Sequence, residues 1–412
     1  MFGFDTTQAK RRQGPRGKFD LPLLVALVGL ACVGVVMVTS SSIAVADSSH
    51  LGQFYYLKHH LMYLSLGLLV AGVAMRTELK VVEKHAFFLM LLAFIMLLAV
   101  FVPHLGMRLN GARRWLNLIV TSFQPVEAVK LILVVYLASY LVRHRESIET
   151  RFLGLVKPIA VSGVIVLLLL AQPDFGSATL VIAVTIALVW LGGARPLFLM
   201  IMGMPLMPLL AIAATSESYR MKRLTSFMDP WKDPFNDGFQ LTQSLMAIGR
   251  GEWTGVGLGS SVLKLSYLPE AHTDFIFAVI GEELGLAGII GVMCLFTLVV
   301  WRGLYIGLKG VEIGQRFAGY IAFGISLMIG FQTMVSIGVN LGALPTKGLT
   351  LPLISYGGSS IALTCAMAGV LLRATYEINR ALDARQMATR MPAAAAPDAN
   401  PNGTREREAV AA

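Results

Sequence analysis

The chain alternates long apolar runs with short polar connections. Ten runs approach the roughly 20 residues that a helix needs to cross a bilayer. They cover residues 21–39, 57–75, 86–103, 122–142, 156–171, 176–193, 196–214, 275–301, 317–341 and 356–376. The pattern predicts an all-α integral membrane protein with about ten transmembrane helices. The one long connection, about 215–273, is expected to be an extracytoplasmic loop between helices 7 and 8.

Two connections carry structure of their own. Gln172–Gly176 contains a proline and a glycine, which break helices, so a tight helical hairpin is expected there. Within the long loop, residues 239–249 predict a short amphipathic helix. The glycine-rich stretch 251–268 carries interleaved apolar residues and favours a loop that rests on the membrane surface.

The first apolar run could be a signal peptide or a retained helix. Ala44-Val45-Ala46 resembles a cleavage site, but the run before it exceeds the roughly 7–15 residues of a signal sequence. We therefore expect a retained first span with a cytoplasmic N-terminus.

The composition excludes a water-soluble domain. Only 14% of the residues are charged and 56% are hydrophobic, whereas soluble domains are about 25% charged. The net charge of +10 could indicate nucleic acid as a partner. However, lysine and arginine concentrate in the segments that ten spans place in the cytoplasm, so the charge reflects topology and no nucleic acid is expected.

The topology divides the chain into three parts. Residues 1–20 form a basic cytoplasmic N-terminus, residues 21–378 the membrane domain, and residues 379–412 a cytoplasmic, mostly disordered tail. We expect both termini in the cytoplasm.

The strongest candidate for chemistry is the stretch Pro269–Asp274, which leads directly into apolar sequence. A carboxylate at the edge of a membrane span is costly, so Asp274 is a functional group unless this stretch, through Thr273 or Asp274, simply provides the N-cap of the next helix. Glu270 and His272 add ionisable groups beside it. Helical angles place Glu282 and Glu283 on different faces, so no carboxylate pair with Asp274 is expected.

Lys130 lies inside an apolar run and needs a partner. One alternative is Glu127, three residues earlier in the same helix. The other is Asp274 from a different helix, which would keep both groups charged.

Two further segments could hold an anion. Arg113 and Arg114 lie outside the membrane against the charge trend, and either bind an anionic ligand or contact lipid beside Trp115. Residues 345–360 contain two prolines and a glycine pair, which prevent a regular helix. Their amides and hydroxyls, with Lys347, would suit a diphosphate, although the segment could also be a plain loop before a helix.

Four motifs in order resemble the SEDS family, which comprises the FtsW, RodA and SpoVE proteins. They are the segments 110–130, 172–176 (QPDFG), 269–283 (PEAHTDFIFAVIGEE) and 347–360 (KGLTLPLISYGGSS). The resemblance covers about residues 20–378 and is closest to the cell-division branch of the family.

The resemblance implies a peptidoglycan glycosyltransferase that polymerises lipid II on the outer face of the bacterial cytoplasmic membrane, at the division septum. It implies a class B penicillin-binding protein (an FtsI-like transpeptidase) and other division proteins as partners. Asp274 matches the family's essential acidic residue, with Lys130 and Glu270 in support. The substrate-binding residues that it implies are Arg114, His272, Lys347, Ser355 and Gly358.

This chemistry needs a base for the acceptor hydroxyl and positive charge for the diphosphate that leaves. No metal-ligand cluster is visible in the sequence, and Mg²⁺ or Mn²⁺ held mainly by the diphosphate stays open as a cofactor. Two alternatives stay open as well: a lipid II flippase, and a non-catalytic division scaffold.

Overall fold

The computed structural model describes most of the chain. The described residues are 17–48, 50, 52–109, 112–117, 122–204, 208, 221, 225–265, 268–346 and 348–390. Lys347, most of the expected span 196–214 and the tail 391–412 lie outside them.

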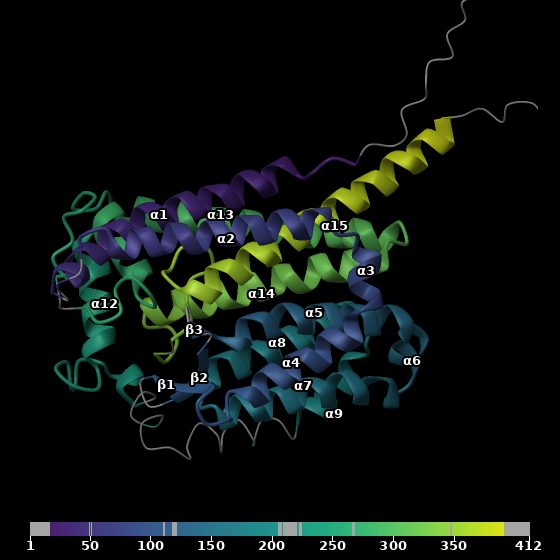
Figure 1. Ribbon diagram of the computed structural model, residues 1–412, viewed down its shortest axis with the longest axis horizontal. Helices are drawn as coiled ribbons and strands as arrows, with labels where there is room; N and C mark the ends of the chain where they lie inside the picture. The colour runs from purple at the N-terminus through teal and green to yellow at the C-terminus, as the bar shows by residue number, and fades with distance from the viewer. Residues whose placement is uncertain are drawn as a thin grey trace, which may run out of the picture.

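Long helices lie side by side along the length of the molecule (Figure 1). One side is formed by α1 (Leu21–Ser48), α2 (Tyr55–Arg76) and α13 (Ile276–Glu312). The middle is formed by α14 (Arg316–Asn340) and α15 (Gly358–Arg390). The other side contains α4 (Ala86–Ala99), α5 (Pro125–Arg143), α7 (Leu153–Ala171), α8 (Phe175–Leu191) and α9 (Pro196–Gly203).

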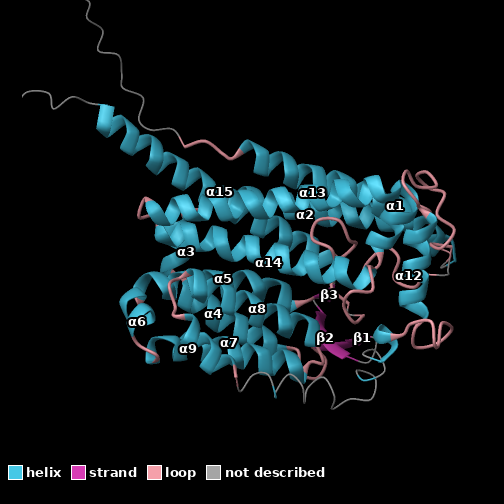
Figure 2. Cartoon of the chain, turned by 180° about the vertical axis from the view of Figure 1, so that it is seen from behind, coloured by secondary structure: helices cyan, strands magenta, loops and turns pink. Residues whose placement is uncertain are grey.

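The two ends of the bundle differ. One end carries the short helices α3 (Leu79–Lys84) and α6 (Arg145–Thr150). The other carries α12 (Phe239–Arg250) and an antiparallel sheet of β1 (Gly106–Leu109), β2 (Ala112–Asn117) and β3 (Ser122–Phe123), in that order (Figure 2). We call the latter end the loop end.

The predicted membrane fold is confirmed. Among the described residues, seven helices are long and apolar enough to cross a membrane, and α4 and α8 are shorter apolar helices. The expected seventh span begins as α9, and its remainder falls largely outside the described part of the chain. The tight hairpin at 172–176 and the amphipathic helix in the long loop are both present.

Burial separates interior from peripheral helices. In α5 and α15, 78% of the most hydrophobic 18-residue stretch of the helix is buried inside the protein, whereas in α2 only 17% is. Helix α2 packs on α15 through small residues: a Cβ on Gly67 would lie 2.9 Å from that of Cys365, and one on Gly369 would lie 2.6 Å from the Ala71 carbonyl oxygen. Small residues let backbones approach closely, which is how helices associate inside a membrane.

The structure adds three features to the expected pattern. The small sheet precedes α5, which begins at Pro125 rather than 122. Helix α13 continues to Glu312 and is broken at Gly285, where φ is 64°. Helix α15 continues to Arg390, so residues 379–390 are helical although the tail from 379 onward was expected to be mostly disordered.

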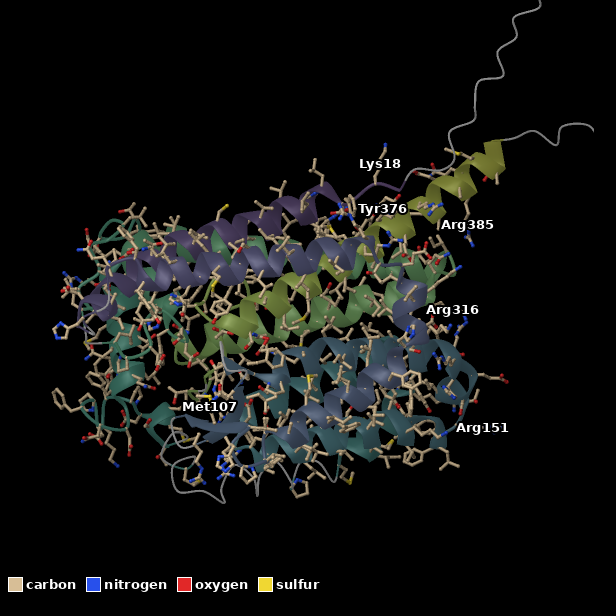
Figure 3. The ribbon with its side chains drawn as sticks, in the orientation of Figure 1. Lys18, Met107, Arg151, Arg316, Tyr376 and Arg385 are labelled. Carbon is tan, nitrogen blue, oxygen red and sulfur yellow. The ribbon has the colours of Figure 1, made fainter. Side chains whose placement is uncertain are left out.

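Basic residues from four separate segments gather at the end opposite the sheet. Figure 3 shows Lys18, Arg151, Arg316 and Arg385 there, with Met107 of β1 at the loop end. These segments are the ones that the sequence assigns to the cytoplasm, so the arrangement fits that prediction, which stays a prediction.

Candidate active site

The loop before α13 is a compact turn. Glu270 has a φ of 56°, and its carbonyl oxygen accepts hydrogen bonds from the amides of Thr273 (3.1 Å) and Phe275 (3.2 Å). Its carboxylate accepts a third from the Thr273 hydroxyl, at 2.7 Å. Helix α13 starts at Ile276 with Phe275 at the N-cap position. The N-cap residue is therefore neither Thr273 nor Asp274.

Three successive carbonyls of this loop, at 272–274, are held from the C-terminal part of the chain. They accept, in order, from the Tyr356 amide (2.9 Å), the Ser355 hydroxyl (2.6 Å) and the Asn340 side-chain amide (3.0 Å). The segments 269–274 and 345–360 therefore form one site, and Ser355 acts there on the protein backbone.

The Asp274 side chain is partly exposed and lies against the backbone of Gly348. A Cβ on Gly348 would lie 2.9 Å from the Asp274 Oδ2 atom, so a larger residue at 348 would displace this carboxylate. Lys347 precedes this glycine but lies outside the described residues, so its substrate-binding role stays a prediction.

His272 forms the buried side of the loop. Its ring centroid is 4.8 Å from that of Tyr56 and 5.6 Å from that of Tyr356, and its Nδ1 atom has no hydrogen-bond partner within the described chain. Burial lowers the pKa of His272, and the charge of Glu270 opposes that shift. The imidazole is consequently favoured in its neutral form.

Lys130 is completely buried and is held by two groups. Its Nζ atom lies 2.8 Å from the Glu127 carboxylate and 2.8 Å from the Gln332 side-chain oxygen. Gln332 in turn donates to the Thr350 carbonyl, at 2.9 Å. Of the two predicted alternatives, the intrahelical ion pair with Glu127 is the one that Lys130 makes. Lys130 is connected to the 345–360 segment indirectly, through the Gln332 side chain.

Arg114 is bound to the turn between α7 and α8. Its guanidinium donates to the carbonyl oxygens of Gln172, at 3.2 Å, and Pro173. A Cβ on Gly176 would lie 3.3 Å from Leu349 Cγ, so this turn also reaches the 345–360 segment. Arg114 therefore ties the sheet to the site; its predicted contact with substrate stays a prediction.

Gly358 starts α15 at a close approach of two helices. A Cβ there would lie 2.8 Å from the Tyr63 ring. This explains the glycine by packing against α2, and its predicted contact with substrate stays a prediction as well.

The two glutamates of α13 belong to a separate network beside the break at Gly285. Glu282 accepts from the Ser261 hydroxyl and from the Val262 amide at 3.1 Å. Glu283 is paired with Lys264 at 2.6 Å. They fasten the preceding loop to the helix and do not form a carboxylate pair with Asp274.

Gln332 and Asn340 both contact the site segments, and neither was predicted from the sequence. A pattern could have found them. Gln332, Ser336 and Asn340 recur every four residues in an otherwise apolar helix and so lie on one face. Polar groups on one face of a membrane helix point to the interior of the bundle.

The fold and site together define a polytopic membrane protein with a polar site where irregular segments meet the ends of its helices. The family model for FtsW, RodA and SpoVE, described as cell cycle proteins, matches residues 21–380. The chain belongs to this family.

Curated relatives and solved structures agree with this assignment. The chain is 53% identical over 390 residues to a probable peptidoglycan glycosyltransferase FtsW of Xanthomonas oryzae pv. oryzae, covering 95% of this chain and 79% of the relative. The FtsW of Thioalkalivibrio sulfidiphilus, of the same description, is 46% identical over 86% of this chain and 89% of its own.

Two structural likenesses accompany them. A chain from a study of the structural coordination of polymerization and crosslinking by a peptidoglycan synthase complex has a TM-score of 0.71 at 28% identity, over 87% of this chain and 98% of that one. RodA of Thermus thermophilus has a TM-score of 0.63 at 26% identity, over 87% and 96%.

Proposed function

We propose that this protein is a peptidoglycan glycosyltransferase that polymerises lipid II into glycan strands on the outer face of the cytoplasmic membrane. The names of its relatives support the activity. The observation that carries the site is the junction of segments 269–274 and 345–360, where Ser355 and Tyr356 bind the carbonyls of the two residues before Asp274, and Asn340 binds the carbonyl of Asp274 itself.

Asp274 acts as the general base in this proposal. The 4-hydroxyl of the acceptor sugar gives its proton to the carboxylate while its oxygen attacks the anomeric carbon of the donor. The bond from that carbon to the phosphate oxygen breaks, and undecaprenyl diphosphate leaves with the electron pair. The proton then passes from Asp274 to solvent or to the departing phosphate.

The leaving diphosphate needs positive charge or hydrogen-bond donors. Lys347 is the proposed cation from the segment that contacts Asp274. Across the described residues, no three His, Cys, Asp or Glu side chains are grouped to hold a metal ion. A divalent cation such as Mg²⁺ would therefore take most of its ligands from the diphosphate, with Asp274 or Glu270 as the protein carboxylate. It would supply charge neutralisation.

The proposed setting is septal wall synthesis with a class B penicillin-binding protein, which would crosslink the strands. In this proposal both termini lie in the cytoplasm. A solved chain of similar fold comes from a study of a peptidoglycan synthase complex, which supports a partner of this kind.

The Asp274→Asn variant tests the base. Purified full-length protein with its transpeptidase partner is given labelled lipid II, and polymer length is followed on gels. We expect at least a hundredfold loss of polymerisation with unchanged folding, because the amide cannot accept the proton. Wild-type polymerisation by the folded variant would remove Asp274 from the mechanism.

Lipid II translocation is the second candidate, because Lys130, Glu127 and Gln332 form a polar network inside the bundle. Liposomes with labelled lipid II in one leaflet distinguish the two. Movement between leaflets without polymer would favour the transporter. A protein that did neither, yet still recruited the transpeptidase, would be a scaffold.

A further inference from the structure

Asn340, the last residue of α14, is fully buried and holds two helices and the site loop together. Its side-chain amide donates to the Asp274 carbonyl (3.0 Å) and the Ser336 carbonyl (2.8 Å). Its side-chain oxygen accepts from the Ala278 amide, at 3.1 Å. Its backbone carbonyl accepts from the Ser244 hydroxyl of α12, at 2.8 Å.

The bond to Ala278 is a helix cap that comes from another helix. The first amides of a helix have no partner within it, and a side chain at the N-cap position ordinarily accepts from the third helical residue. Phe275 occupies that position in α13 and has no polar side chain to offer. Ala278 is the third residue of α13, and its amide donates both to the Asn340 side-chain oxygen and to the Phe275 carbonyl.

Asn340 therefore forms hydrogen bonds to the chain both before and after the first residue of α13. One bond fixes the peptide that follows Asp274, and the other fixes the first turn into which that peptide leads. The Cα–Cβ direction of Asp274 depends on these backbone angles. The complete burial of Asn340 means that water does not replace a lost bond without rearrangement.

We propose that Asn340 is a positioning residue for glycosyl transfer, a cap supplied by α14 that sets where the Asp274 carboxylate points. The inference rests on the proposed function, in which Asp274 is the base. A misplacement of about 1 Å can reduce a rate on the order of a hundredfold, so a backbone shift at Asp274 acts on turnover more than on substrate binding.

Two substitutions separate positioning from capping. Asn340→Asp keeps an oxygen for the Ala278 amide, and aspartate caps helices as well as asparagine does. It removes the N–H groups that hold the Asp274 and Ser336 carbonyls. Asn340→Ala removes both functions. Thr185→Val is the control, because it removes a buried hydrogen bond of 3.1 Å to Ser162 within the α7–α8 hairpin.

Two measurements are made on the full-length protein with its transpeptidase partner. Polymerisation of labelled lipid II gives kcat and KM. Hydrogen–deuterium exchange gives the protection of the amides at 275–279. We expect Asn340→Ala and Asn340→Asp to lower kcat about ten- to hundredfold with KM within twofold of wild type, while Thr185→Val retains kcat.

In exchange, Asn340→Ala should expose the amides at 275–279, and Asn340→Asp should protect them nearly as well as wild type. Wild-type kcat in Asn340→Asp would overturn the positioning role, since the donor to Asp274 would then be dispensable. Equal losses in Thr185→Val and Asn340→Ala would reduce the effect to general destabilisation and overturn it too.

The same assay includes Asp274→Asn. If that variant is inactive while both Asn340 variants turn over normally, the positioning role fails and the base assignment stands. If Asp274→Asn polymerises like wild type, the base assignment fails, and the exchange data still report whether Asn340 caps α13.

Discussion

At the scale of single residues, charge inside this bundle is balanced locally. Lys130 is fully buried, and its nearest anion lies one helical turn away on its own helix. Gln332 completes its coordination from α14 and passes the contact on to Thr350. A buried ion that loses its partner is far more costly than the loss of the whole pair.

This asymmetry makes a prediction about Lys130. Lys130→Met leaves the Glu127 carboxylate buried without its cation and should cost about 3–5 kcal/mol. Glu127→Gln should cost less, since Lys130 keeps Gln332. The double variant Glu127→Gln/Lys130→Met should recover most of the loss. Thermal unfolding in detergent measures the stability of all three variants. If Lys130→Met and the double variant were equally destabilised, the unpaired Glu127 carboxylate would not be the cause of the loss.

His272 makes the molecule sensitive to acid. Burial lowers its pKa below the ordinary 6.5, with Glu270 opposing, so the folded state favours the neutral imidazole more than the unfolded state does. The associated stability is fully present above about pH 6.5 and is lost as the pH falls toward the folded-state value. Melting temperatures from pH 8 to pH 5 should therefore fall less in His272→Phe than in wild type. Parallel curves for the two proteins would contradict this origin.

At the scale of elements, the break in α13 joins a loop to a helix. The carbonyls of Glu282 and Glu283 accept from the amides of Val256 and Gly257, at 3.0 and 3.1 Å. On the other side of the break, the Leu286 and Ala287 amides donate to the carbonyls of residues 252 and 253. The groups that the break releases from the helix are therefore satisfied by the loop, as a membrane-embedded backbone requires.

Gly285 is the residue that permits this exchange. Its φ of 64° and ψ of −162° are accessible essentially only to glycine, and a Cβ there would lie 2.3 Å from the Gly255 backbone nitrogen. Gly285→Ala should destabilise the protein by at least about 1–3 kcal/mol. Gly291→Ala in the same helix meets no atom within 4 Å and should be neutral or slightly stabilising. Equal melting temperatures for the two variants would show that the break does not depend on glycine.

At the scale of the whole molecule, the helices were predictable from the sequence, whereas the segments that connect them were predictable only in part. Apolar runs locate spans because the bilayer imposes their length. The hairpin at 172–176 and the amphipathic helix of the long loop were predictable from local chemistry. The small sheet was not, because short strands beside polar turns carry little periodic signal.

The candidate site was likewise only partly predictable: its segments could be located from the sequence, but its side-chain contacts could not. The resemblance pointed to segments 269–274 and 345–360, and the structure shows that these two segments meet. It did not reveal that Arg114 binds the Gln172 carbonyl, nor that Lys130 acts through Gln332. Such contacts depend on the relative rotation of helices, which a single sequence does not specify.

The hydrogen bonds to the three carbonyls at 272–274 also determine when the site can form during biosynthesis. Their donors lie about 65 to 85 residues further along the chain, at 340, 355 and 356. At translation rates of about 5–20 residues per second, the loop emerges seconds before the groups that fix it. A nascent chain that has inserted all of α13 still lacks a formed site. The proposed active site therefore forms only once α14 and the segment before α15 have been made, and unfinished copies in the membrane are expected to be inactive.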